Sequence, residues 1–243
     1  VTGNQFALCS EYNTPKNSKD AILLFDYIGN TGLGGTIASG DFTPYNVESP
    51  YMTPISNAGL EGISYNPQKQ VFYGGFEGNV SNSWKVCEIT LSGAPPPEHI
   101  GGTTSVQLFS EASVSWPTHL HRISDIYYDP NSKHLFLTDH GDNPPPSYSD
   151  MSRVFECDLE GNFIDYVDLK DSQGNHYNQI EGITFSPDGG RMVIVGEDGA
   201  NDKSDLGYYT ISSFATSGVY KIPAVLTVSG VVDSDRHIAE ADN

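Results

Sequence analysis

The sequence predicts an all-β fold built from repeated antiparallel units, and three observations support this. An eight-residue phrase that ends in Asn-Pro, Asp-Pro or Ser-Pro occurs three times, at 60–67, 123–130 and 180–187. Its prolines recur at intervals of roughly 60 residues, which suits a four-stranded blade better than a helical repeat. The 243 residues include 25 Gly, 15 Pro and 14 Tyr, a composition typical of short strands and tight turns. We therefore expect a β-propeller of four-stranded blades, with about four repeats of ~60 residues visible.

The first two strands of each unit are predicted to form a hairpin. Each copy of the phrase leads into a polar turn, such as 66–70, and then into a short apolar run. Two apolar runs on either side of a turn rich in Asn, Pro or Gly are typical of a β-hairpin. The predicted hairpins cover residues 60–77, 123–139 and 180–197, and each ends in an acidic residue. Acidic side chains are therefore expected at the open end of every hairpin.

A third strand is predicted after the hairpin in each unit. Residues 86–93 match 154–161, and 22–29 form a plausible third member of this set. Residues 6–11 would then be the second strand of a further unit, whose first strand is missing at the N-terminus. Near the C-terminus, 236–241 resemble the opening of the second unit. This segment is a candidate either for the strand that closes the ring on 6–11 or for the start of a blade beyond this chain.

The chain is expected to form one β-propeller domain over residues 1–243, because this length buries a substantial core without staples. It starts at Val1 rather than at a methionine, so a processed or partial chain is one expectation. No apolar run is long enough to predict a transmembrane helix. Three cysteines cannot form a closed disulfide set, and in the repeat alignment Cys87 and Cys157 correspond to apolar residues of another unit. This pattern favours cysteines that pack in the core.

The charge balance limits the possible partners. With 31 acidic and 12 basic residues, the formal net charge is −19. Binding to nucleic acid or to an anionic membrane requires a positive surface, so neither partner is expected. The charge favours cations, or a salty extracellular medium that screens the repulsion.

Acidic residues at the hairpin ends are the predicted metal ligands. Like charges that face each other across a hairpin repel unless they are hydrated or share a cation. Calcium accepts six to eight oxygen ligands in irregular geometry and is the cofactor that we expect. The alternative is that these acids are solvated or accept hydrogen bonds from backbone N–H groups at strand ends. The candidate ligands are Glu11, Glu61, Glu77, Asp125, Asp139, Glu181 and Glu197.

Three residues are candidates for proton transfer near the same hairpin ends: His121, Asp125 and His140. Histidine and aspartate are common general acids and bases. The alternative is that the histidines are solvated side chains beside a strand. The chain contains no Gly-x-Ser-x-Gly, Walker, dinucleotide-binding or His-Glu-x-x-His motif, so no linear pattern identifies a nucleophile.

The recurring phrase resembles the SdiA-regulated family and the related phytase-like esterase domains, whose blades open with Glu-Gly-Ile or Ser-Gly-Leu and close on an acid. The openings at 61–63, 124–126 and 181–183 match this pattern, although Asp125 replaces the usual small residue. The resemblance spans roughly residues 55 to 200. It implies a propeller with acidic groups around its channel mouth, often holding calcium, in a secreted, periplasmic or cell-surface protein.

Two functions remain in view. The first is an extracellular, calcium-stabilised binding or assembly module that presents loops to a glycan, a cell surface or copies of itself. We favour it at this point because the acids recur in every unit whereas the histidines do not. The alternative is a metal-assisted hydrolase of the phosphoesterase or lactonase type, with its site at the channel mouth. A hydrolase needs at least one of His121, Asp125 and His140 to face that site.

Overall fold

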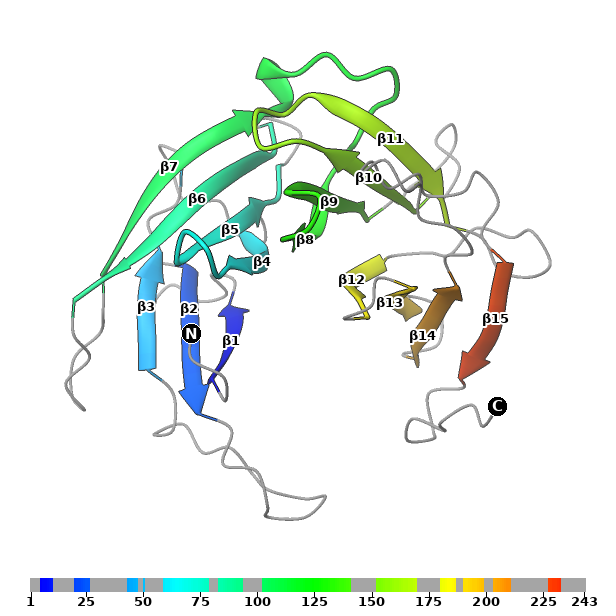
Figure 1. Ribbon diagram of the computed structural model, residues 1–243, viewed down its shortest axis with the longest axis horizontal. Coiled ribbons are helices and arrows are strands. Elements are labelled where there is room, and N and C mark those ends of the chain that lie inside the picture. Colours follow the sequence, from blue (N-terminus) through cyan, green and yellow to red (C-terminus); the bar gives the residue numbers. More distant parts are fainter. Residues whose placement is uncertain are drawn as a thin grey trace. The chain divides into compact units, whose positions relative to one another are not determined.

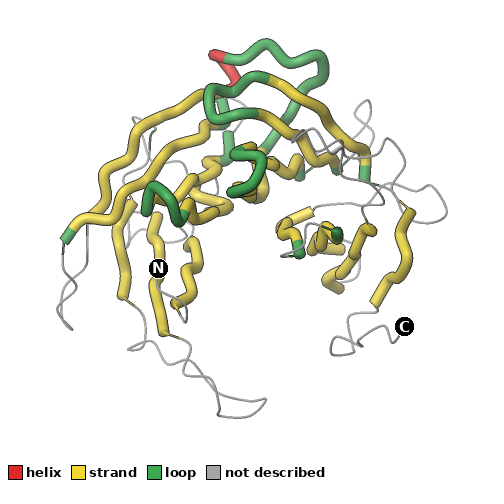
Figure 2. The backbone as a smooth tube through the Cα atoms, viewed as in Figure 1, coloured by secondary structure: helices red, strands yellow, loops and turns green. Residues whose placement is uncertain are grey.

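A computed structural model describes most of the chain, and the chain divides into two compact units, Val1–Ala112 and Ser113–Asn243. The described residues fold into strands and one short 3-10 helix, Glu111–Ser113 (Figure 2). The part of the chain that is described contains no helix with the length and apolarity of a membrane span. The described residues are 5–10, 20–26, 43–47, 50, 59–78, 83–93, 102–140, 152–169, 180–186, 190–198, 203–210 and 227–232.

The first unit contains two antiparallel sheets in which neighbouring strands follow one another along the chain (Figure 1). The first sheet has three described strands: β1 (Gln5–Ser10), β2 (Asp20–Asp26) and β3 (Thr43–Val47). The second has four: β4 (Leu60–Asn66), β5 (Val71–Phe76), β6 (Lys85–Ser92) and β7 (Gly102–Ser110).

The second unit also contains two antiparallel sheets, each with four strands in sequence order. Its first sheet consists of β8 (Ile123–Asp129), β9 (His134–Asp139), β10 (Arg153–Cys157) and β11 (Phe163–Asp168). Its second consists of β12 (Ile180–Phe185), β13 (Arg191–Asp198), β14 (Lys203–Thr210) and β15 (Thr227–Val232).

These sheets confirm the predicted repeat. The three hairpins are the pairs β4–β5, β8–β9 and β12–β13, and the predicted third strands are β2, β6 and β10. The predicted strand at 6–11 is β1, which pairs with β2. The segment 236–241 lies outside the described residues, so ring closure stays a prediction.

Polar turns close the first two hairpins. Asn66 accepts hydrogen bonds from the backbone N–H groups of Gln68 and Lys69 through Oδ1, at 3.0 and 3.1 Å. Asp129 occupies the same place in the next hairpin and bonds the N–H groups at 131 and 132, each at 3.1 Å. Both turns end on a residue with φ near +60°, Gln70 and Lys133. The predicted polar turns are therefore Asx turns in these two hairpins, and each fixes the closed end of its hairpin.

In each unit, apolar faces of neighbouring sheets pack together among the described residues. In the first unit Ile22 and Val47 pack with Leu60 and Ile89, all fully or almost fully buried. A comparable cluster in the second unit joins β9–β11 to β12 and β13 and includes Val154 and Ile194. Burying each such side chain contributes about 1.5–3 kcal/mol. Cys87 and Cys157 are buried as expected, and burial raises the pKa of the Cys87 thiol to about 12.

The three hairpins share a β-bulge near their open ends. In β4–β5, Leu60 pairs with Phe76 and Gly62 with Gly75, so Glu61 is an extra residue. The same shift makes Ser124 the extra residue in β8–β9 and Glu181 the extra residue in β12–β13. Bulges redirect side chains and are common next to active sites. The second residue of the motif therefore occupies an equivalent, unusual backbone position in every copy.

Candidate functional site

The hairpin registers correct one part of the predicted repeat. The sequence pattern matched Asp139 with Glu77 and Glu197, but the two strands of the β8–β9 hairpin have the same lengths and register as those of β4–β5. Asp139 pairs with Ile123 just as Phe76 pairs with Leu60. His140 is therefore the residue level with Glu77. The backbone hydrogen bonds of the two residues also correspond. The N–H of Glu77 donates to the carbonyl of the residue before Leu60 at 2.9 Å, and the N–H of His140 donates to the carbonyl of the residue before Ile123 at 3.1 Å.

The middle hairpin differs from the other two at four equivalent positions near its open end. The shared backbone shows that the fold itself does not require these differences. Repeats within one chain thus act as internal controls, and the middle copy is the candidate functional site. The differences are Ser124 for Glu61 and Glu181, Asp125 for Gly62 and Gly182, Asp139 for Phe76 and Gly196, and His140 for Glu77 and Glu197.

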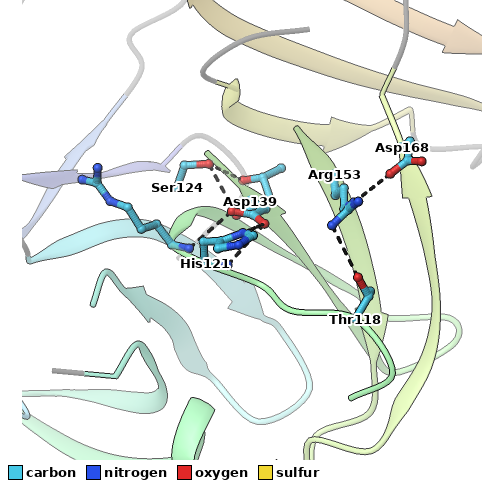
Figure 3. A network of polar contacts seen from close by, with 8 residues as sticks. Thr118, His121, Ser124, Asp139, Arg153 and Asp168 are labelled. Carbon is cyan, nitrogen blue, oxygen red and sulfur yellow. Dashed lines mark hydrogen bonds and ion pairs between the residues drawn. The ribbon is translucent and has the colours of Figure 1, made fainter. Parts of the chain in front are cut away.

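The central contact of this site joins His121 to Asp139 (Figure 3). The imidazole Nδ1 lies 3.2 Å from Oδ2 of Asp139, whose side chain is fully buried. Asp139 also accepts the backbone N–H groups of His121 and Arg122, each at 3.3 Å. An ionised carboxylate only accepts hydrogen bonds, so this contact assigns the proton to Nδ1 and the lone pair to Nε2.

Two hydroxyl groups hold the bulge beside Asp139. Ser124 Oγ and Thr138 Oγ1 are 2.9 Å apart, and both residues are buried. Thr138 Oγ1 also donates to the backbone carbonyl of Asp125 at 3.3 Å. A neutral hydroxyl pair therefore occupies the bulge next to the buried Asp139 carboxylate, where a glutamate would add a second negative charge.

Asp125 connects the two sheets of the second unit. Its Oδ1 accepts the N–H of Ile126 and its Oδ2 accepts the N–H of Ile183 on β12, both at 2.8 Å. Burial raises the pKa of the Asp125 carboxyl to about 7, the two backbone N–H groups act in the opposite direction, and nearby Glu181 raises it further. A carboxyl that titrates near neutral pH is a common feature of functional sites.

His140 also contacts the sheet that follows. Its Nε2 lies 2.8 Å from Oε1 of Glu181, the bulge residue of β12. The Glu181 side chain is 38% exposed, whereas that of His140 is 15% exposed and its Nδ1 is buried. Glu181 therefore offers its carboxylate to solvent, while neither ring nitrogen of His140 is well placed to meet a substrate.

The other predicted ligands are dispersed or lie beyond what is described. In the first unit Glu61 accepts the N–H of Gly59 through Oε1 at 3.3 Å, and Glu77 is buried. Glu11 lies outside the described residues, as does the side chain of Glu197. Within the described ranges, no three His, Cys, Asp or Glu side chains group as metal ligands. Calcium binding therefore stays a prediction.

A second buried pair, between β9 and β10, was not anticipated from the sequence. His134 Nδ1 lies 2.7 Å from Oε1 of Glu156, whose side chain is fully buried with Oε2 lacking a hydrogen-bond partner. Burial raises the pKa of Glu156 to about 6, His134 opposes this, and Asp165 and Asp129 raise it further. No sequence motif places 134 next to 156, because their proximity follows from the β9–β10 register.

Comparisons with known proteins give a family match and weak structural likenesses. The family model described as SdiA-regulated matches residues 46–199. No curated protein sequence gives a significant match. Among solved structures, a protein from Lactobacillus plantarum is 10% identical, with 99% of this chain and 69% of that one covered and a TM-score of 0.45. A periplasmic gluconolactonase from Pseudomonas aeruginosa is 11% identical, with 94% and 83% covered and a TM-score of 0.34. Likenesses at these scores do not indicate a function.

Proposed function

The chain belongs to the SdiA-regulated family, whose model matches more than half of its residues, and from this premise we propose that the protein is a β-propeller hydrolase that cleaves ester bonds. Its repeated antiparallel sheets are the blades, and the open end of the β8–β9 hairpin carries the reaction. The family resemblance to esterase-type propellers is consistent with this class, but the proposal depends on one contact.

The contact between His121 and the buried Asp139 carries the proposal. Asp139 holds the imidazole through Nδ1–H, so Nε2 accepts a proton from water as the water oxygen attacks the ester carbonyl. The new bond between water and the carbonyl carbon forms, and the bond from that carbon to the leaving oxygen then breaks. The imidazolium returns its proton to the leaving alkoxide. A base of this kind accelerates reactions about 10²–10⁴-fold.

This geometry reverses the preference for a binding module that the sequence alone suggested. That preference depended on the acids recurring in every unit while the histidines did not. The middle unit departs from the others at equivalent positions, and these departures include Asp139 and His140. His121 is the better base because Nε2 of His140 already contacts Glu181 and its Nδ1 is buried.

Charge favours an uncharged ester or lactone over a phosphoester as the substrate. Asp139 contacts His121, and Glu181 contacts His140, the residue that follows Asp139 in the chain. The whole chain carries a formal charge of −19. A phosphomonoester dianion would be repelled by these groups unless a cation screened them. A neutral lactone carries no charge and does not experience this electrostatic repulsion.

The test is a substrate panel assayed with calcium and with chelator. We expect turnover of uncharged lactones or carboxylic esters, with phosphomonoesters turned over at least about tenfold more slowly. Preferential turnover of phosphomonoesters that disappears with chelator would favour the metal-assisted alternative. No turnover of either class by folded protein would refute the hydrolase.

A second candidate is the calcium-stabilised binding or assembly module, which the acids of the first unit favour. Glu61 and Glu77 offer carboxylate oxygens, the donors that calcium prefers. Two carboxylates are fewer than its usual six to eight ligands, so backbone carbonyls, water or residues beyond the described part would complete the shell. Such a module would be secreted, periplasmic or cell-surface and would bind a glycan, a surface or copies of itself.

A further inference from the structure

We propose that Asp125 is a positioning residue that fixes the start of β12 and thereby holds the Glu181 carboxylate against His140. The geometry of the second unit supports each step. The consequence for catalysis rests on the proposed function, but the positioning itself does not.

The first step is the bond from Asp125 to an edge strand. β12 is the end strand of its sheet in the described residues and pairs with β13 alone. The N–H of the buried Ile183 donates to Asp125 Oδ2 at 2.8 Å, and this bond gives a partner to a donor on a strand that has no second neighbour in its sheet. The carboxylate also lies close to the backbone, since a Cβ on Gly182 would be 3.8 Å from Oδ2. One carboxylate oxygen thus performs the pairing that a neighbouring strand would supply.

The second step is that this bond is peculiar to the β8–β12 contact. The other two hairpins have Gly62 and Gly182 at the position of Asp125, and glycine has no side chain to reach a neighbouring sheet. The described repeats therefore contain this link once, at the hairpin that carries the His121–Asp139 contact.

The third step connects the link to Glu181. Glu181 is the extra residue of the bulge, and a bulge interrupts the hydrogen-bond ladder that would otherwise hold it. Asp125 secures the backbone two residues further on, while His140 bonds the side chain at 2.8 Å. Both anchors come from the middle hairpin, at positions where it differs from its repeats. Together they fix Glu181, the exposed carboxylate of the site.

The experiment uses the whole chain with ¹⁵N-labelled histidine and amide hydrogen exchange. In the unmodified protein we expect a protected imidazole N–H signal from His140, and Glu181→Ala assigns it by removing its acceptor. In Asp125→Gly we expect the Ile183 amide to exchange at least about tenfold faster and the His140 signal to weaken in the same way. Glycine suits this position because Gly62 and Gly182 occupy it in the other hairpins.

The matched control is Asp165→Gly. Asp165 Oδ1 accepts the N–H of the next residue, Tyr166, at 2.9 Å, which is the same local bond that Asp125 makes to Ile126. The control removes that local bond without touching β12, so both signals should remain. If the glycine variant does not fold, Asp125→Asn replaces it, with one acceptor retained and an intermediate loss of protection expected.

Two results would overturn the proposal: an Ile183 amide as protected in Asp125→Gly as in the unmodified protein, or a His140 signal that survives Asp125→Gly but disappears in Glu181→Ala. On an ester substrate, Asp125→Gly should lower kcat about tenfold with little change in KM. If the unmodified protein cleaves no ester, the proposed function fails while the two spectroscopic results still decide the role of Asp125.

Discussion

The carboxylate of Asp139 is fully buried, and a buried charge costs several kcal/mol unless donors surround it. The backbone N–H groups of His121 and Arg122 and the His121 ring supply those donors. The segment before β8 is therefore tied to the end of β9 by one side chain. This tie gives the imidazole a fixed tautomer and direction, which a general base requires.

Asp139→Asn tests this residue directly. Asparagine keeps the size of the side chain but presents an NH₂ group to backbone donors, so at least one donor loses its acceptor. We expect a loss of about 1–3 kcal/mol in the free energy of unfolding and a fall in kcat of about 100-fold or more. Urea unfolding and initial rates measure both effects. Asp158→Asn is the control, since Asp158 also accepts two backbone N–H groups but in an exposed turn. Equal effects of the two substitutions would contradict the role given to Asp139.

Glu156 should make stability depend on pH. Its pKa is raised from 4.5 to about 6, so the stability it contributes is fully present below pH ~4.5 and is lost as the pH rises through about 6. Glu156→Gln stays neutral and removes this dependence. The free energy of unfolding of the variant, relative to the unmodified protein, should therefore rise by about 2 kcal/mol between about pH 3.5 and about pH 7. A difference that is flat over this range, measured by urea unfolding, would show that Glu156 is not destabilised as an anion.

At the scale of elements, the sequence predicted the hairpins and third strands because turn residues and apolar runs recur in the same order. It did not predict the bulge, since apolar periodicity indicates which strands pair but not where one strand has an extra residue. A signal was present: Gly62 and Gly182 interrupt strand patterns, and such glycines often mark bulges. Equal spacing from Pro67 to Phe76 and from Pro130 to Asp139 also indicates that His140, rather than Asp139, corresponds to Glu77.

Gly74 tests how tightly the β4–β5 hairpin is packed. A Cβ at this position would lie 2.6 Å from Cδ1 of Ile89 and 2.8 Å from Cδ1 of Leu60, and both side chains are buried. Gly74→Ala should therefore cost about 1–3 kcal/mol in the free energy of unfolding, since these side chains must move in a filled core. Gly102→Ala, at an exposed strand end, should change it by less than about 0.5 kcal/mol. Similar values for both, from thermal or urea unfolding, would contradict the packing described.

At the scale of the whole molecule, contacts between residues far apart in the chain could not be predicted from the sequence. The bond from Asp125 to Ile183 joins residues 58 positions apart, and it depends on the packing of two sheets rather than on any motif. The net charge, in contrast, follows from the composition alone, and it predicts that the protein attracts cations. With a formal charge of −19, the chain repels itself, and a cation held by the folded state would relieve part of that repulsion.

Calcium should therefore raise the melting temperature if it binds the acids of the repeats. At about a hundred times its Kd, a ligand that binds only the folded protein adds roughly 2.7 kcal/mol of stability, which shifts melting by several degrees. Chelator should reverse the shift, and Glu61→Gln with Glu77→Gln should reduce it. Coincident melting curves with calcium and with chelator would show that these acids hold no calcium.

The most direct test of the central claim compares His121→Gln with His119→Gln on the same ester or lactone substrate. The two imidazoles are neighbours, with ring centroids 4.6 Å apart, but the bond to the buried Asp139 belongs to His121. We predict that His121→Gln lowers kcat/KM by about 10²–10⁴-fold, whereas His119→Gln leaves it within about twofold. Unchanged hydrolysis by folded His121→Gln protein would contradict the assignment of His121 as the general base.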